Sequence, residues 1–380
     1  MLEGGALAAT GDNFPAFHLR NKLIAMKVKV FLFGLLVAGV SCQKNKNMQP
    51  PPSVIAGSYQ QTNLVSDTAA YGAARIDPAL LNAWGIAVNP TGIIWISANH
   101  AGGTVVYDST GKTLLGPVDI PSQGVKFGGS PSGVVFNATT DFAIPGNGLT
   151  AKFIFVNEDG TISAWAGGDS TLTVVDRSSS NAVYKGVALA NDGTGNFLFA
   201  ANFKGGKIDV FDRTFTYVST KPFTDPNIPA GFGPFNIANI GGHLYVTYAK
   251  LKAPDDMDDQ AGPGNGYINV FDLNGVLVKR FASQGVLNSP WGLAQVPAGF
   301  GLPLHSILVG NFGDGRINVY DSTGVLQGVF GNNGMPIVID GLWALDFPVN
   351  EAPRSSPNKL YFTAGPLDEG HGLFGYITMQ

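Results

Sequence analysis

Short apolar runs alternate with polar positions along most of the chain and end at turn residues. In the clearest case Ile317 and Val319 alternate with polar neighbours, and the pair Asp314-Gly315 comes just before them. An Asp-Gly pair between two apolar runs favours a two-residue β-hairpin, because both turn positions need a positive φ. The pattern therefore predicts short antiparallel strands joined by tight turns.

Variants of this strand, ending on an aromatic residue that is usually followed by Asp, recur along the chain. The copies are centred on Tyr107, Trp165, Phe211, Phe271, Tyr320 and Tyr376. They follow one another at intervals of about 50 residues, and a repeat of that length with several strands per unit is typical of a β-propeller.

A second repeated motif precedes each of these strands and combines Gly with small or apolar residues. Its copies cover residues 83–88, 131–136, 184–189, 233–238, 290–294 and 341–345. Such a run suits the innermost strand of a blade, because neighbouring blades crowd the central axis and leave little room for large side chains. Six copies predict six blades.

The C-terminal blade is predicted to be one strand short. Its inner strand lies near Trp343, and two further strands cover residues 359–364 and 373–379. A strand-like segment at 59–65 precedes the first inner strand, and adding it to the last blade would close the ring and remove an exposed sheet edge. We therefore expect an all-β fold, a six-bladed β-propeller over residues 55–380, with the last blade closed by an N-terminal strand.

Composition agrees with this architecture. Charged residues make up only 13% of the chain, and its 51 glycines and 24 prolines suit turns and short strands better than helices. The net charge of −4 indicates no basic face, so no nucleic-acid partner is expected. A monomer is expected.

The N-terminal region differs from the rest. Residues 1–25 show no periodicity and are either upstream sequence or a disordered extension, whereas 26–41 have the basic start and short apolar core of a signal peptide. Cys42 follows at once, and is either an incidental thiol or the lipidated residue of a bacterial lipoprotein. Residues 42–54, with their run of prolines, then read as a lipidated cysteine and a tether.

Polar and aromatic residues are predicted to meet at one mouth of the channel. The first two strands of each blade form a hairpin, so the start of one and the end of the other lie at the same rim. Amides with aromatic walls suit a small-ligand site. The residues placed at this ligand-binding rim are Trp84, Asn99, His100, Asn157, Lys185, Asn202, Asn236, Lys250, Trp291, Asn311 and Trp343.

The same Asn and Trp residues can instead have structural roles. An Asn at a strand end can hydrogen-bond its own backbone, and a Trp-Gly pair can pack one blade on the next. A long loop at the same rim contains Asp255, Asp256, Asp258 and Asp259. We interpret it as a lid loop, whose carboxylates either bind Ca²⁺ or form a solvated acidic turn.

Catalytic residues are harder to assign. The sequence has neither a Gly-x-Ser-x-Gly nor a His-Glu-x-x-His motif, and its one cysteine lies outside the predicted propeller. The acid–base candidates at the predicted mouth are Glu158, Asp368, Glu369 and His371. The metal ligands stay unassigned.

Several longer motifs carry a resemblance to a known family. They lie at residues 184–188, 200–203, 206–212, 244–250, 287–292, 309–315, 339–343, 362–366 and 372–375. With these motifs the chain resembles an uncharacterised family of exported bacterial propellers, some of which end in a PEP-CTERM sorting tag. More distantly it is similar to NHL-repeat and gluconolactonase-like propellers. The latter likeness implies a divalent metal held by Glu, Asn and Asp in the channel.

Two functions are consistent with these patterns. The first is an exported, periplasmic binding or scaffold lipoprotein, attached to a bacterial membrane only through its lipid anchor, with a small molecule or an envelope protein as partner. The alternative is a metal-dependent, lactonase-like hydrolase or lyase that uses Glu158, Asn202, Asn311 and a loop carboxylate in the channel. The sequence leaves enzymatic activity open.

Overall fold

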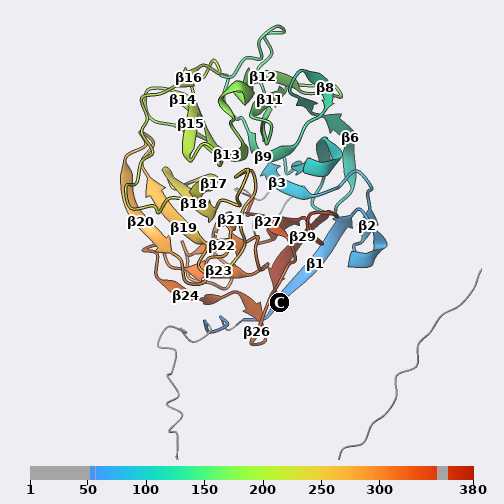
Figure 1. Cartoon of the computed structure of the whole chain (residues 1–380). Helices are drawn as coiled ribbons and strands as arrows, with labels where there is room; N and C mark the ends of the chain where they lie inside the picture. The colour runs from blue at the N-terminus through green and yellow to red at the C-terminus, as the bar shows by residue number, and fades with distance from the viewer. Residues whose placement is uncertain (1–51, 56, 349–357) are drawn as a thin grey trace, which may run out of the picture. The chain divides into compact units, whose positions relative to one another are not determined.

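Six β-sheets follow one another around a ring in the computed structural model, which describes residues 52–55, 57–348 and 358–380 (Figure 1). Five sheets have four strands and the sixth has five. Within each sheet the four strands of the blade pair antiparallel in order from the axis outward. The predicted six-bladed, all-β propeller is confirmed.

The inner strands contact one another in sequence around the axis, and the last of them returns to the first. They are β3 (Ala83–Val88), β9 (Pro131–Phe136), β13 (Tyr184–Asn191), β17 (Phe232–Ile240), β21 (Pro290–Gln295) and β27 (Leu342–Asp346). Glycine permits this close approach: a Cβ on Gly85 would lie 2.4 Å from the carbonyl oxygen of Ser132, and one on Gly292 would lie 2.8 Å from that of Trp343. The repeated glycine is therefore required by blade contact.

The remaining blade strands lie progressively farther from the axis. Second strands are β4 (Ile94–Ala98), β10 (Phe153–Asn157), β14 (Asn196–Asn202), β18 (His243–Lys250), β22 (Ile307–Asn311) and β28 (Leu360–Ala364). Third strands are β5 (Gly103–Tyr107), β11 (Thr161–Trp165), β15 (Lys207–Phe211), β19 (Gly266–Phe271), β23 (Ile317–Tyr320) and β29 (Leu373–Met379). Outer strands are β6 (Thr113–Asp119), β12 (Leu172–Asp176), β16 (Tyr217–Val218), β20 (Leu277–Ser283), β24 (Leu326–Val329) and β1 (Tyr59–Ser66).

The ring is closed by β1, which lies beside β29 in Figure 1. The two strands pair antiparallel from Tyr59 opposite Met379 to Ser66 opposite Leu373. This confirms the predicted N-terminal closing strand. The short β2 (Arg75–Ile76) adds a parallel edge outside it, so that the C-terminal blade has the fifth strand.

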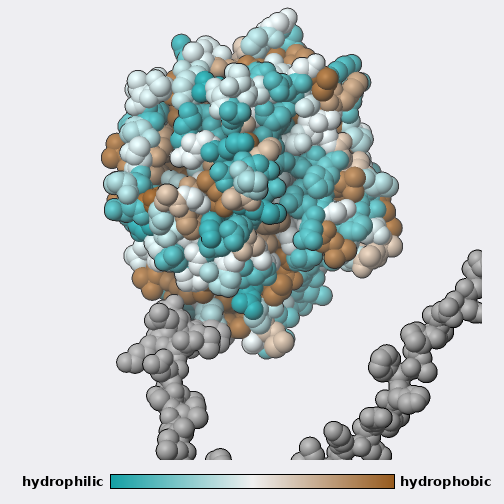
Figure 2. All heavy atoms as spheres, viewed as in Figure 1, coloured by the Kyte–Doolittle hydropathy of each residue, from teal (hydrophilic) through white to brown (hydrophobic). Residues whose placement is uncertain are grey.

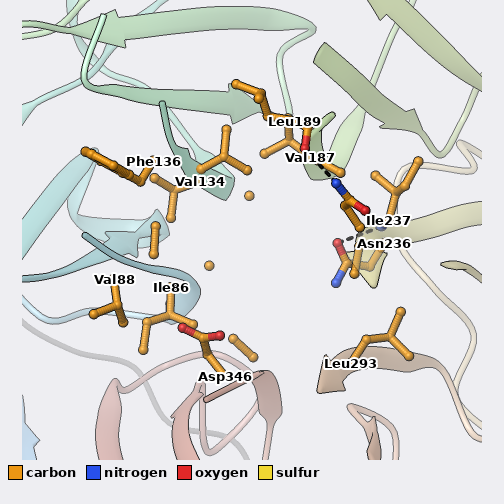
Figure 3. Close-up of a pocket in the computed structure, with 18 of the residues that line it drawn as sticks. Ile86, Val88, Val134, Phe136, Val187, Leu189, Asn236, Ile237, Leu293 and Asp346 are labelled. Carbon is orange, nitrogen blue, oxygen red and sulfur yellow. Dashed lines mark hydrogen bonds between the residues drawn. The ribbon is translucent and has the colours of Figure 1, made fainter. Parts of the chain in front are cut away.

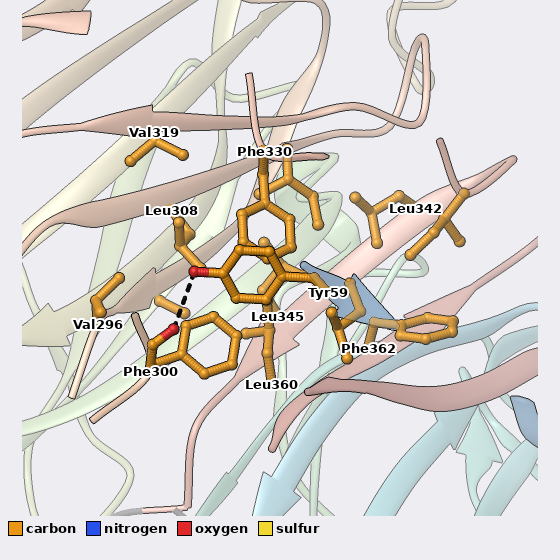
Figure 4. Close-up of a cluster of buried hydrophobic side chains, with 14 of the residues drawn as sticks. Tyr59, Val296, Phe300, Leu308, Val319, Phe330, Leu342, Leu345, Leu360 and Phe362 are labelled. Atoms are coloured by element: carbon orange, nitrogen blue, oxygen red, sulfur yellow. Dashed lines mark hydrogen bonds between the residues drawn. The ribbon is translucent and has the colours of Figure 1, made fainter. Parts of the chain in front are cut away.

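Closure is stabilised by a cluster of buried side chains between the last two blades (Figure 4). Tyr59 is 1% exposed, its ring packs on Phe300 and Phe330, and its hydroxyl donates to the carbonyl oxygen of Phe300 at 3.0 Å. The aromatic side chain therefore attaches the closing strand to the neighbouring blade as well as to its own.

Short elements outside the blades line the edges of the sheets. They are the hairpins β7 (Pro121–Ser122) with β8 (Val125–Gly128) and β25 (Gly331–Asn332) with β26 (Met335–Pro336), and the 3₁₀ turns η1 (Ala69–Tyr71), η2 (Asn99–Ala101) and η3 (Ser178–Ser180). Val54, in the predicted tether, bridges Val329 on the outer strand β24. The end of that segment thus covers a sheet edge instead of leaving it unpaired.

The surface seen in Figure 2 is largely hydrophilic, with hydrophobic side chains in small groups. The outer strand β20 and the turn before β24 contribute exposed apolar residues such as Val278 and Val325, 53% and 58% exposed. Isolated exposed apolar residues are normal for a folded domain and assign no binding role.

Candidate functional site

A buried lysine lies at the centre of the predicted mouth. Lys185 is the second residue of β13 and is 2% exposed, and its ammonium contacts Glu158 and lies 3.3 Å from Asp258. Burial alone would lower the pKa of Lys185, but the two carboxylates outweigh burial and raise it. The lysine is therefore a fixed cation among carboxylates contributed by separate blades.

An aromatic layer lies beside this cation. The rings of Trp84 and Trp343 stack at 3.7 Å, and Phe312 stacks on the other face of Trp343 at 3.8 Å. The Lys185 ammonium lies 5.1 Å from the centre of the Trp84 ring, and the Trp291 indole donates to the Lys185 carbonyl oxygen at 2.9 Å. Because these residues come from β3, β13, β21, β27 and the end of β22, the layer connects blades across the axis.

Amide side chains hold the carboxylates in place. Asn99 donates to Glu158 at 2.9 Å, while Asn82 donates to Glu369 and accepts from the Trp343 indole at 2.9 Å. Burial, followed by the nearby charge of Glu158, raises the pKa of Glu369 to about 7. A carboxyl group with this pKa can both hold and release a proton near neutral pH.

Three of the four recurring asparagines serve their own blades. Asn157 donates to the hydroxyls of Thr161 and Ser163, Asn202 donates to Asp209, and Asn311 donates to a backbone carbonyl and to Asp314. These three asparagines therefore have the structural role. Of the four, Asn99 is the one that contacts the charged centre. Asn236 donates to the Trp291 carbonyl oxygen at 2.8 Å.

The acidic loop reaches the mouth through part of its length. Asp258 contacts Lys185, although its side chain is 62% exposed. Burial raises the pKa of Asp259, and the positive charge of Lys185 partly opposes this effect. The Asp255 carboxylate accepts from the backbone N–H of Met257, and the backbone N–H of Asp256 donates to the Lys252 carbonyl oxygen, so both bonds stay within the loop. The loop therefore lies over the charged centre, whereas its role as a lid stays a prediction.

The remaining predicted residues lie toward the edge of the rim. His371 contacts Asp67 at 2.7 Å and packs on Tyr71, so it is directed at the closing blade. His100 is exposed beside Asn99, Asp368 is exposed, and Lys250 is half-buried at the end of β18. The structure does not bring these four residues into the charged centre.

A divalent metal fits this centre poorly. The Lys185 ammonium already lies between Glu158 and Asp258, where it supplies the positive charge that a metal ion would bring. Across residues 52–55, 57–348 and 358–380, no three or more His, Cys, Asp or Glu side chains are grouped to hold a metal ion. Calcium binding stays an untested expectation from the sequence.

The axial channel contains a cavity of about 440 Å³ (Figure 3). All six inner strands contribute to its wall, including Ile86, Val134, Val187, Ile237, Leu293 and Leu345. Asn236 and Trp291 also line it. Phe136, Asn239 and Phe347, near the ends of the inner strands, are partly or fully exposed, so the cavity opens at the rim opposite the predicted mouth.

One carboxyl group projects into this apolar cavity, as Figure 3 shows for Asp346. Asp346 ends β27, and burial raises its pKa to about 7, although the backbone N–H of Phe347 partly opposes the shift. The side chain keeps some solvent-accessible area because water can enter the open channel. Protein atoms of the channel wall nevertheless surround it. Desolvation within the channel therefore controls its charge.

Sequence reasoning missed two residues of these sites. Asn82 has a φ of 47°, a left-handed conformation that Asn tolerates, directly before β3. An Asn directly before an inner-strand motif is a signal that the sequence offered for this residue. Asp346 follows the recognised inner-strand motif Trp343–Leu345, where an acidic residue is out of place in an apolar run, but the motif alone gave no reason to expect a cavity around it.

Comparison with known proteins identifies relatives in a virus. None of the protein-family models matches the chain. The chain is 36% identical over 318 residues to the uncharacterized protein R648 of Acanthamoeba polyphaga mimivirus, covering 80% of this chain and 76% of R648. Protein L690 of the same virus is 36% identical over 320 residues, covering 80% of this chain and 82% of L690.

Solved structures share the fold at low sequence identity. The soluble aldose sugar dehydrogenase of Escherichia coli matches with a TM-score of 0.52 and 14% identity, covering 85% of this chain and 100% of that chain. Virginiamycin B lyase of Staphylococcus aureus matches with a TM-score of 0.49 and 12% identity, covering 86% and 100%. At this level of identity the likeness to solved structures shows the propeller fold alone.

The predicted localisation is wrong. Relatives from a giant virus of amoebae contradict a periplasmic lipoprotein anchored to a bacterial membrane. They equally give no support to the resemblance to an exported bacterial family with PEP-CTERM tags. Residues 26–41 and Cys42, on which the prediction depended, lie outside the described residues. Among the residues described, no helix is long and apolar enough to cross a membrane.

Proposed function

Since the chain belongs to the family of the mimivirus proteins R648 and L690, whose names state no activity, we propose a function from its own site: the axial channel binds a small, largely apolar molecule. Binding, as opposed to catalysis, was also the first expectation from the sequence. We propose the cavity, and not the charged rim, as the ligand site.

The shape and lining of the channel support this assignment. Small-molecule sites are concave, enclose about 300–1,000 Å³, and are mostly apolar with a few polar groups. The channel offers about 440 Å³, with apolar side chains from every blade. Trp291 and Ala344 line the cavity and belong to the same buried cluster as Trp84 and Trp343, so the aromatic layer borders the site.

A single observation carries the proposal: Asp346 is the one ionisable side chain among the described residues that line the cavity. A carboxyl group in an apolar wall is costly unless it has a partner. Structural packing alone gives no reason to place it there, since Ala344 and Leu345 on the same strand pack without polar groups. A ligand that uses the carboxyl group would offset the cost.

Filling the cavity tests the proposal. Leu293 is 8% exposed and lines the channel, so Leu293→Trp should occupy the space that a ligand needs. The matched control is Val278→Trp on the outer strand β20, where the side chain is 53% exposed. Binding of the neutral fluorescent probe N-phenyl-1-naphthylamine would be titrated for each protein, with circular dichroism to verify folding.

We expect saturable binding by the wild type and the control, and an affinity at least about tenfold lower for Leu293→Trp. Absence of saturable binding to the wild type, or equal binding by both variants, would contradict the proposal. Should Leu293→Trp fail to fold, Ala344→Val at the cavity wall is a smaller intrusion that gives the same comparison.

A second candidate function is hydrolysis or lyase chemistry at the charged rim. Glu369 favours it, because a pKa of about 7 suits a general acid or base and the residue lies close to Glu158 and Lys185. Its test is a Glu369→Gln variant assayed against a panel of lactones. Turnover by the wild type that falls at least about 100-fold in the variant would support an enzyme. A wild type without turnover would leave the channel as the functional site.

A further inference from the structure

We propose that the ligand of the channel is a cationic amine on an apolar body, with its ammonium group paired to the Asp346 carboxylate. This inference rests on the proposed function and deepens it by naming the chemical class of ligand. It follows from the position of one acidic side chain relative to the walls that surround it.

Among the described residues, the walls contain no competing charge. The elements around Asp346 are β3, β9, β13, β17, β21 and the turn after β27, and the described residues they contribute to the cavity include no Lys, Arg, His, Glu or second Asp. The polar side chains among them are Thr139, Asn236 and Asn239. Asn236 already donates to the Trp291 carbonyl oxygen and accepts from the backbone N–H of Ile237, so at most one of its N–H groups remains for another partner.

The chemistry of the carboxyl group selects the class of ligand. An ionised carboxylate in an apolar channel, bonded only by the backbone N–H of Phe347, gains most from a cation that also donates hydrogen bonds. An anionic ligand would be repelled. A free divalent ion needs several oxygen ligands, and one carboxylate does not provide them. An amine on an apolar body satisfies both the carboxylate and the walls.

The pairing has a defined pH dependence. Because burial raises the pKa of Asp346 to about 7, the empty site is mostly protonated at pH 6 and mostly ionised at pH 8. An alkylamine keeps its proton throughout this range. Amine affinity should therefore rise between pH 6 and pH 8, whereas the affinity of a neutral ligand of the same shape should not rise.

A matched pair of probes tests this inference: 1-naphthylmethylamine and 1-naphthylmethanol share the apolar body and differ in the polar group. Each would be titrated calorimetrically into the full chain at pH 6 and pH 8. The key variant is Asp346→Asn, which keeps the shape of the side chain. The control is Asp340→Asn, which removes the same charge from an exposed position before β27.

We expect the amine to bind the wild type about tenfold more tightly than the alcohol at pH 8. The preference should shrink at pH 6, disappear in Asp346→Asn and persist in Asp340→Asn. Equal binding of both probes, unaffected by Asp346→Asn, would overturn the amine inference and leave the apolar channel site standing. Failure of both probes to bind the wild type would overturn the channel site as well.

Discussion

Replacing Asp346 with Asn should stabilise the protein at neutral and alkaline pH. The carboxyl group has a pKa near 7 in the folded chain, compared with 3.8 as its ordinary value, because the channel disfavours the charged form. The folded state thus binds this proton more tightly than the unfolded state does. The stabilisation that this proton provides is complete below pH 3.8 and is lost as the pH rises through 7.

The size of the effect follows from the same values. Each pH unit between the two pKa values corresponds to about 1.36 kcal/mol, so a rise from 3.8 to about 7 corresponds to about 4 kcal/mol. Water enters the open end of the channel and solvates part of the charge. We therefore expect Asp346→Asn to raise the unfolding free energy by about 2–4 kcal/mol at pH 8 and to change it little at pH 4.

Guanidinium unfolding of both proteins at several pH values between 4 and 8 measures this difference. Using the difference between variant and wild type cancels the titration of every other group. Asp340→Asn, at an exposed position, is the control and should follow the wild type within about 0.5 kcal/mol. If the unfolding free energies of Asp346→Asn and wild type keep a constant separation across this range, the channel does not perturb the carboxyl group as argued.

Other substitutions test the closure of the ring and the charged rim. Tyr59→Ala should lower the free energy of guanidinium unfolding by about 3–5 kcal/mol, because it removes a ring that is 1% exposed. Tyr59→Phe loses only the hydrogen bond to Phe300 and should lower the same free energy by about 1 kcal/mol. Glu158→Gln weakens the pairing of buried Lys185 and should cost about 2–3 kcal/mol in urea unfolding, and an unchanged midpoint would show that the pair is not structural. Asp258→Asn should cost less than about 1 kcal/mol in thermal unfolding, since that carboxylate is 62% exposed, and a larger loss would mean that the loop is integral to the fold.

The fold was predictable because each blade repeats local chemistry that the sequence displays. The Asp that follows the third strand is one example: the Asp321 carboxylate accepts from the backbone N–H groups of Thr323 and Val325, at 2.9 Å and 3.0 Å. Asp212 does the same with Thr214 and Thr216. The recurring Asp is therefore a turn-forming residue, and its spacing reports the blades directly.

The charged rim was predictable only in part. Antiparallel geometry predicted Glu158, Lys185 and Asp258 at one rim, and the lysine contacts both carboxylates although the three residues lie far apart in the sequence. The same reasoning could not separate Asn99, which faces the centre, from Asn311, which bonds within its own blade. Side-chain direction at a strand end depends on packing between blades, which the repeat pattern does not encode.

The channel cavity could not be predicted, because its size depends on how closely the blades approach. Gly85 and Gly133 show only that inner strands can come close, and the depth and openness of the channel follow from all six together. Asp346 gains its unusual environment from residues on the other five inner strands. Its position in the sequence therefore says little about its pKa.

A crystal structure of the protein with 4-bromobenzylamine would show whether the channel binds an amine at Asp346, because anomalous scattering locates the bromine without ambiguity. We expect bromine within the channel, among Val134, Val187 and Leu293, and the amine nitrogen within hydrogen-bond distance of the Asp346 carboxylate. Bromine located only at the charged rim around Lys185, or an empty channel at saturating ligand, would contradict this expectation.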